Sequence, residues 1–153
     1  LGFSTLGLPF NLDAWDGFPA ARERLYAGAA AANAKLVTLA GDTHTAWVNT
    51  LQDAQGEQRG VEFGCTSITS PGSGAYIKDI PDLGAQVMAA NEDVVWHDPF
   101  SRGYTIVTLT PEAARAEYRT VSNILSHDYS VETVAVYETR QQDGKLTDLA
   151  SLS

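Results

Sequence analysis

The sequence is poor in cysteine, in basic residues and in long apolar runs. Cys65 is the single cysteine of 153 residues, which excludes an internal disulfide and a cysteine-rich zinc module. Ten lysine and arginine residues face nineteen acidic ones, giving a formal net charge of −9. This balance argues against nucleic acid and against an anionic membrane surface as partners. No apolar run approaches the roughly 20 residues that a membrane-spanning helix needs.

The hydrophobic fraction of 44% is enough for a packed core, and the length fits one domain. The chain begins at Leu1, without a methionine or a signal-peptide pattern, and we expect it to be a fragment of a longer protein. An acidic protein that binds a phosphate ester needs a local cation to overcome its own field. A metal ion is the usual source of that cation.

The order of the elements predicts an α/β fold. An alanine-rich helix is expected from Pro19 to about Asn33, followed by a buried strand over 36–40 that ends at Gly41. Further strands are expected over 45–51, 61–68, 102–110, 116–122 and 132–139, with a short helix over 83–91. The first half is therefore α/β and the second half mostly sheet, as in a layered α/β sandwich.

The stretch Gly-Asp-Thr-His-Thr at 41–45 follows the buried strand directly. In extended chain Asp42 and His44 would share one face, with Cα atoms roughly 6.5–7 Å apart. That spacing lets two side chains reach neighbouring metal ions about 3.5–4 Å apart. Carboxylate and imidazole suit divalent ions and iron. A simpler interpretation is a strand end with a solvated aspartate and a packed histidine.

The surrounding motifs favour the metal site. A D-x-W-D-G-F-P loop at 13–19 precedes the helix, and V-E-F at 61–63 precedes T-S-I-T-S-P-G at 66–72. R-G-Y at 102–104 leads into a strand, which T-P-E follows at 110–112. In this order, over roughly residues 9 to 140, the motifs resemble the C-terminal part of PhoD-like alkaline phosphatases.

The resemblance implies part of a calcineurin-like metallophosphoesterase fold, a layered β-sandwich flanked by helices. It implies hydrolysis of phosphate monoesters and diesters with iron and calcium, in an exported, periplasmic or extracellular enzyme. Carried over, Asp42 would bind calcium and His44 iron, and both would be catalytic. The remaining ligands belong to the family's N-terminal half, so residues 1–153 would hold part of the bimetal site and be inactive alone. The implied partners are that missing half and a small phosphate ester, not nucleic acid or membrane.

Other side chains are weaker candidates. Asp13, Trp15 and Asp16 could line the active-site rim and touch substrate, whereas the alternative for Asp16 is to cap the helix that begins near Pro19. Arg102 could meet a substrate phosphate, although we favour a role in which it pins the Arg-Gly-Tyr turn to a neighbouring carboxylate. His97 and His127 are expected to be solvated loop residues.

Two other classes of function stay open. The chain could be a stand-alone binding or interaction module derived from the same fold, and the absence of the other ligand motifs supports that reading. A purely structural domain is the third possibility, which the ordered motif matches disfavour. A continuous reading frame upstream of Leu1 would exclude the stand-alone module.

Overall fold

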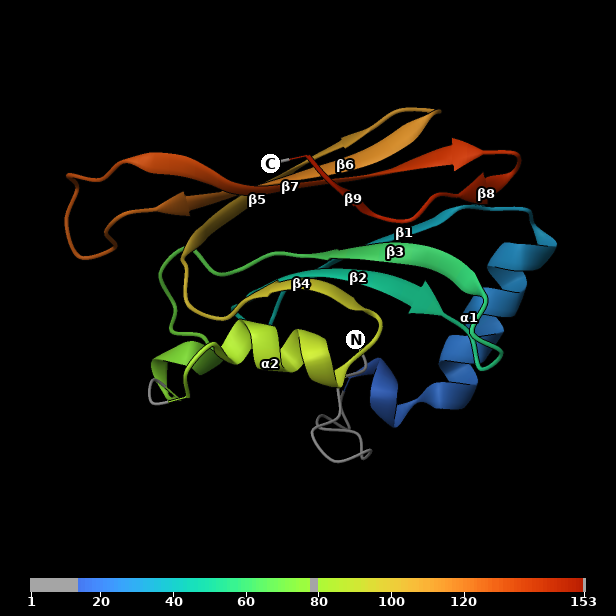
Figure 1. Cartoon of the computed structure of the whole chain (residues 1–153), viewed down its shortest axis with the longest axis horizontal. Coiled ribbons are helices and arrows are strands. Elements are labelled where there is room, and N and C mark those ends of the chain that lie inside the picture. The colour runs from blue at the N-terminus through green and yellow to red at the C-terminus, as the bar shows by residue number, and fades with distance from the viewer. Residues whose placement is uncertain (1–13, 78–79, 153) are drawn as a thin grey trace.

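A computed structural model of the chain describes residues 14–77 and 80–152. The first half contains the helices η1 (Trp15–Gly17), α1 (Pro19–Ala31), η2 (Ser73–Ala75) and α2 (Leu83–Ala90), with the strands β1 (Leu36–Ala40), β2 (Ala46–Gln52), β3 (Gln58–Gly64) and β4 (Val94–Asp98). The second half contains β5 (Gly103–Leu109), β6 (Ala113–Val121), β7 (Val131–Gln142), β8 (Lys145–Leu146) and β9 (Ala150–Ser151). Figure 1 shows three layers, in which the sheet of β1–β4 lies between the helices and the second sheet.

Helix α1 begins where the sequence predicts, because Pro19 occupies its first turn and lacks the N–H that a helix start leaves unpaired. The predicted cap by Asp16 is wrong. Phe18 is the N-cap residue, and no side chain makes a capping hydrogen bond there. The Asp16 carboxylate instead accepts a hydrogen bond from Arg22 Nη1 at 3.3 Å. Asp16 therefore ties the short η1 helix to the first turn of α1.

The inner sheet has the strand order β1-β3-β2-β4. β1 runs parallel to β3, whereas β2 is antiparallel to both β3 and β4. Because β3 lies between β1 and β2, the loop 41–45 must reverse direction and cross the end of β3, a span of about 10 Å for two strand spacings. Five residues can span roughly 17 Å when extended, so the loop that carries the candidate ligands has enough length to turn tightly as it crosses.

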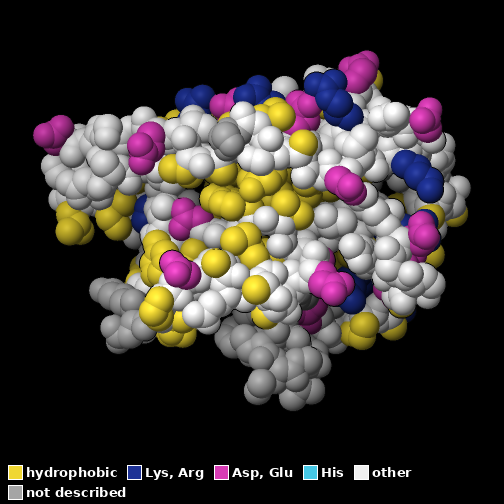
Figure 2. Space-filling view, in the orientation of Figure 1, with side chains coloured by type: hydrophobic (Ala, Val, Ile, Leu, Met, Phe, Trp, Pro, Cys, Tyr) yellow, Lys and Arg dark blue, Asp and Glu magenta, His cyan; other side chains and the backbone are white. Residues whose placement is uncertain are grey.

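The outer sheet packs on the inner one through small and aromatic side chains. Along β6 every second residue is buried, as expected for a strand with one face on the core. The core contains the buried residues Ala46, Val48, Val61, Phe63, Ala114, Ala116, Tyr118 and Ala135. Tyr118 also donates its hydroxyl to the carbonyl oxygen of Trp47 at 2.6 Å, which links the two sheets. Figure 2 shows hydrophobic side chains gathered along the seam between the sheets.

The two sheets and the helix layer confirm the predicted α/β sandwich. The strand predicted over 61–68 begins earlier and ends at Gly64. β4 was not predicted, and it contains His97, which is buried rather than solvated. His127 is exposed, as expected. Among the described residues, no helix is long and apolar enough to cross a membrane.

Candidate functional site

The candidate ligands Asp42 and His44 lie in the loop between β1 and β2, not in extended chain. The prediction that they share one face of a strand is therefore wrong. Asp42 has φ 67° and His44 has φ 57°, both in the left-handed region that residues with a Cβ seldom adopt. Both residues lie where the chain reverses direction over the end of β3, so the segment forms turns instead of extended chain.

Asp42 is the central residue of a three-residue turn. The N–H of Thr43 donates to the carbonyl oxygen of Gly41 at 2.8 Å, which closes a γ-turn with positive φ, the rarer and strained form of that turn. The Asp42 side chain is exposed and forms no hydrogen bond or ion pair with any described residue. The strained turn thus presents an unpaired carboxylate to solvent at the end of β1.

The ring of His44 is oriented by the backbone of the 66–72 segment. Its Nδ1 lies 3.0 Å from the carbonyl oxygen of Pro71. Because a carbonyl oxygen only accepts, Nδ1 carries the proton, and the lone pair of the neutral ring is on Nε2. A histidine ligand is commonly held in this way, with one ring nitrogen bonded to a carbonyl and the other presented to a metal.

The main chain at His44 is held by a buried arginine. Arg102 is 8% exposed, and its Nη1 donates to the carbonyl oxygens of His44 (2.9 Å) and Ser101 (2.7 Å). Thr66 Oγ1 lies 3.1 Å from the same His44 oxygen and 3.1 Å from Arg102 Nη1. No described carboxylate lies within ion-pair distance of Arg102, so the predicted carboxylate partner is wrong, and Arg102 binds main-chain carbonyls instead. Direct contact of Arg102 with substrate stays a prediction.

Gly72 packs closely against the backbone of the loop at His44. A Cβ at Gly72 would stand 2.2 Å from the His44 carbonyl oxygen, so only glycine allows the backbone to approach this closely. The sequence indicated 66–72 as a family motif but gave no role to Thr66, Pro71 or Gly72. Their contacts cross 22 to 28 positions along the chain, and no spacing rule within the sequence reveals such contacts.

Trp47 bonds to the loop at Thr43 and packs against His97. Its indole Nε1 donates to Thr43 Oγ1 at 3.0 Å, and its ring stacks on the His97 imidazole with centroids 3.5 Å apart. His97 is 6% exposed and its Nδ1 lies 2.9 Å from the carbonyl oxygen of Ala46. Burial lowers the pKa of His97, which favours the neutral, stacked form. His97 thus helps to position Trp47, which in turn bonds to the loop.

The other predicted site residues lie elsewhere or outside the described residues. Asp13 lies outside the residues that the structure describes. Trp15 lies beside Arg22 at a cavity of about 80 Å³ between α1 and the inner sheet, and Asp16 bonds to Arg22. None of residues 41–45 lines that cavity. Contact of Trp15 or Asp16 with substrate stays a prediction.

The described residues do not complete a metal site by themselves. They contain no group of three or more histidine, cysteine, aspartate or glutamate side chains that could hold a metal ion. Asp42 and His44 together offer one carboxylate and one imidazole nitrogen, which are suitable ligands for iron or a harder divalent ion. Further ligands would have to come from outside the described part of the chain.

Comparison with known proteins gives three findings. The family model of PhoD-like phosphatases matches residues 3–118. Alkaline phosphatase D of Bacillus subtilis (strain 168) is 30% identical over 155 residues, which cover 97% of this chain and 26% of the relative. The solved structure of PhoD superposes with a TM-score of 0.79 at 28% identity, covering 99% of this chain and 29% of that one. The chain thus spans about a quarter of the length of the curated relative it matches.

Proposed function

Because the chain belongs to the PhoD-like phosphatase family, we propose that it supplies part of the active site of a metal-dependent phosphoesterase that hydrolyses phosphate monoesters and diesters. The observation that carries the proposal is the His44 ring. Its Nδ1 bonds to the Pro71 carbonyl, and its Nε2 lone pair is left for a ligand. The buried His97 makes a similar bond through its Nδ1, so what distinguishes His44 is that it is only partly buried and lies two residues from the exposed carboxylate of Asp42.

The residues present fit a metal ion. The Asp42 carboxylate is exposed and bonds to no described residue, so the strained turn that carries it does not stabilise the fold. Strain of this kind is typical of functional sites. By the family resemblance the ions are iron, held by His44, and calcium, held by Asp42. When bound, such ions would supply Lewis-acid chemistry at the phosphoryl group, and Asp42 and His44 would help to hold them there. The remaining ligands lie in the part of the relatives that this chain does not span, so these residues alone are proposed to be inactive.

The chain's own residues contribute rigidity to that site. Arg102, Thr66 and Gly72 fix the carbonyl of His44, and Pro71 fixes its ring, so the ligand atoms are positioned before any substrate binds. Pre-positioned ligands reduce the reorganisation that the reaction requires. The same family membership supports a periplasmic or extracellular location and a small phosphate ester as substrate.

The test uses the protein expressed from its complete gene. We expect His44→Ala and Asp42→Ala to lower phosphoesterase activity by at least about 100-fold, a typical effect of losing electrostatic stabilisation of the transition state. We expect each variant to lose bound metal by elemental analysis and to keep the far-ultraviolet circular dichroism of the wild type. His127→Ala, at an exposed histidine, is the matched control and is expected to keep both activity and metal. Full activity and full metal content in both loop variants would sink the assignment.

A further inference from the structure

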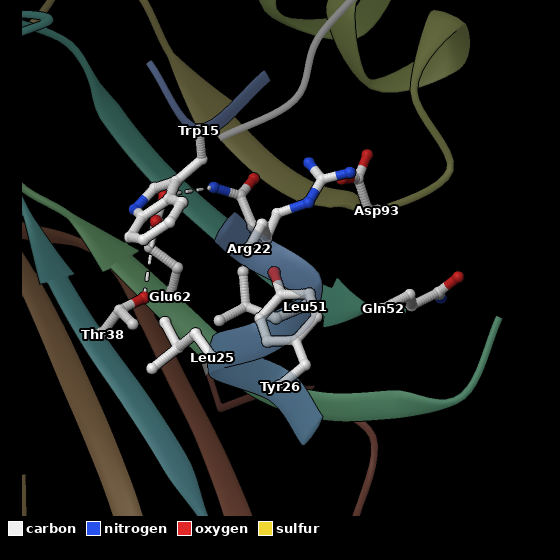
Figure 3. Close-up of a pocket in the computed structure, with 10 residues that line it drawn as sticks. Trp15, Arg22, Leu25, Tyr26, Thr38, Leu51, Gln52, Glu62 and Asp93 are labelled. Atoms are coloured by element: carbon white, nitrogen blue, oxygen red, sulfur yellow. Dashed lines mark hydrogen bonds between the residues drawn. The ribbon is translucent and has the colours of Figure 1, made fainter. Parts of the chain in front are cut away.

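An open hollow of about 530 Å³ adjoins the residues that hold His44. Pro71, Ser101 and Arg102 line it, and Pro71 is the residue whose carbonyl oxygen lies 3.0 Å from His44 Nδ1. Arg102 in turn donates to the main-chain oxygen of His44 at 2.9 Å. The cavity beside α1, drawn in Figure 3, shares no lining residue with this hollow. Of the two, only the hollow is therefore built on residues that hold the candidate metal-binding loop.

Exposed apolar side chains line the hollow from two connections of the chain. Phe100, between β4 and β5, is 49% exposed, and Ile124 and Leu125, between β6 and β7, are 39% and 93% exposed. Figure 1 shows both connections at the same end of the molecule, beside the segment that follows β3. Exposed apolar side chains that gather beside a hollow are typical of a ligand-binding surface.

Hydrogen bonds and packing hold these side chains in place. The N–H of Phe100 donates to Asp98 Oδ1 at 2.8 Å. The N–H of Leu125 donates to Asn123 Oδ1, also at 2.8 Å. A Cβ at Gly74 would lie 2.6 Å from Cδ1 of the Phe100 ring, so this ring packs directly on the Gly74 backbone. Ordered turns thus present Phe100 and Leu125, which lowers the entropy cost of binding a ligand against them.

The charges around the hollow restrict what it can hold. Among its described lining residues the charged ones are Arg102 and Glu132, and their opposite charges leave the lining without a net charge. The Nη1 of Arg102 is already bonded to main-chain carbonyls. An ionic occupant would lose water without gaining a free charge partner. The apolar side chains Phe100, Ile124 and Leu125 instead favour an uncharged group rich in carbon.

We propose that this hollow holds the alcohol portion of the substrate, which makes the enzyme selective for phosphate esters of uncharged, apolar alcohols. The inference rests on the proposed function, because that function places the phosphoryl group beside His44. Pro71 joins the two parts of the site, since its carbonyl orients the His44 ring and the residue also lines the hollow. One water occupies about 10–15 Å³ by this measure, so a chain of several carbon atoms fits.

Calorimetric titration with alkylphosphonates tests the inference on the protein expressed from its complete gene. In a phosphonate the alkyl group is attached directly to phosphorus, where an ester has its alcohol portion, and it cannot be hydrolysed off. Hexylphosphonate and methylphosphonate carry the same charge at alkaline pH and differ only in chain length. We expect hexylphosphonate to bind about 10-fold or more tightly, because partial burial of its chain removes apolar surface from water.

Two variants and one control locate the alkyl chain. Leu125→Ser and Phe100→Ser each remove an apolar side chain of the hollow, and each is expected to reduce the preference for hexylphosphonate to about 3-fold or less. Leu109→Ser removes an apolar side chain that is 59% exposed on β5 and does not line the hollow. This control is expected to keep the wild-type preference.

Equal affinities of the wild-type protein for the two phosphonates overturn the inference, and so does a preference that survives in both variants. If another segment of the protein fills the hollow, Leu125→Ser lowers the unfolding temperature and leaves the preference unchanged, which also overturns it. An active enzyme that binds neither phosphonate overturns the inference but not the proposed function. An inactive wild-type protein that binds neither phosphonate overturns the proposed function and the inference together.

Discussion

The carbonyl oxygen of His44 accepts a hydrogen bond from Arg102 Nη1 at 2.9 Å, across 58 positions of sequence. The donor carries a full charge and is buried, so this bond is stronger than one between neutral groups. Thr66 Oγ1 lies 3.1 Å from the same oxygen. The shape of the candidate metal-binding loop is therefore held by residues that are not candidate ligands.

Replacing Arg102 should destabilise the fold and impair the site together. Arg102→Ala leaves the carbonyls of His44 and Ser101 without their charged donor, and we expect a loss of about 2–3 kcal/mol in the free energy of unfolding. Arg102→Lys keeps the charge but not the planar fork, and should lose less. Urea denaturation of the protein from its complete gene measures both.

Arg140→Ala is the matched control for Arg102, because its side chain is 64% exposed and pairs with Glu138 at the surface. An exposed ion pair contributes at most about 1 kcal/mol. If Arg102→Ala proves no more harmful than Arg140→Ala, the proposed role of Arg102 in holding the loop is wrong.

Two glycines beside the loop should differ sharply in their tolerance of a methyl group. A Cβ at Gly72 meets the His44 carbonyl oxygen at 2.2 Å, so Gly72→Ala must displace the loop and should cost at least about 2 kcal/mol. A Cβ at Gly41 meets nothing within 4 Å, and Gly41→Ala should stay within about 1 kcal/mol of the wild type. Thermal unfolding compares the two, and equal losses would contradict the close approach at Gly72.

Replacing Asp42 should abolish activity, whereas the effect on the unfolding temperature should depend on the new residue. Its positive φ suits glycine, so in metal-free protein we expect Asp42→Gly to unfold at a similar or higher temperature than the wild type. Asp42→Asn should be neutral, because asparagine tolerates the left-handed region, whereas Asp42→Ala should lose about 1 kcal/mol. All three variants should lose activity and metal, since each removes the carboxylate. A glycine variant less stable than the alanine variant would argue against strain at this position.

The stability of the protein should fall in mild acid through His97. Burial lowers the folded-state pKa of His97 from its ordinary 6.5, and the hydrogen bond to Ala46 opposes this only in part. The unfolded state therefore binds a proton first. The contribution of His97 is complete above pH 6.5 and decreases as the pH falls toward the folded-state pKa, by up to about 1.4 kcal/mol per pH unit.

Urea denaturation between pH 5 and 8 measures this slope. His97→Phe keeps a ring that can stack on Trp47 but cannot titrate, so its acid-side slope should be shallower. His127→Phe changes an exposed histidine and should keep the wild-type slope. An unchanged slope in His97→Phe would show that other groups control the acid sensitivity.

The fold could be predicted where local signals and burial agree. The proline at the start of α1 and the apolar run Leu36–Ala40 fixed those two elements within a residue or two. β4 was missed because a tryptophan, a histidine and an aspartate occur together before Pro99, which favours a loop when tertiary contacts are unknown. The His97 ring is buried because it stacks on Trp47, a contact between distant parts of the chain that local sequence does not reveal.

The candidate site was predictable in its residue types but not in its shape. The order of motifs indicated Asp42 and His44, yet the extended geometry assumed for them ignored the strand order of the sheet. The two left-handed residues lie where the chain reverses over β3, between β1 and β2.

The side chains and backbone that hold the His44 loop come from Trp47, from the 66–72 segment and from Arg102. The loop and its supports therefore form one unbroken interval of the chain, from Gly41 to Arg102. When two relatives recombine outside this interval, the chimaera inherits the loop and its supporting residues from the same parent. A crossover inside the interval separates them, and this predicts where chimaeric phosphatases keep or lose their ligand geometry.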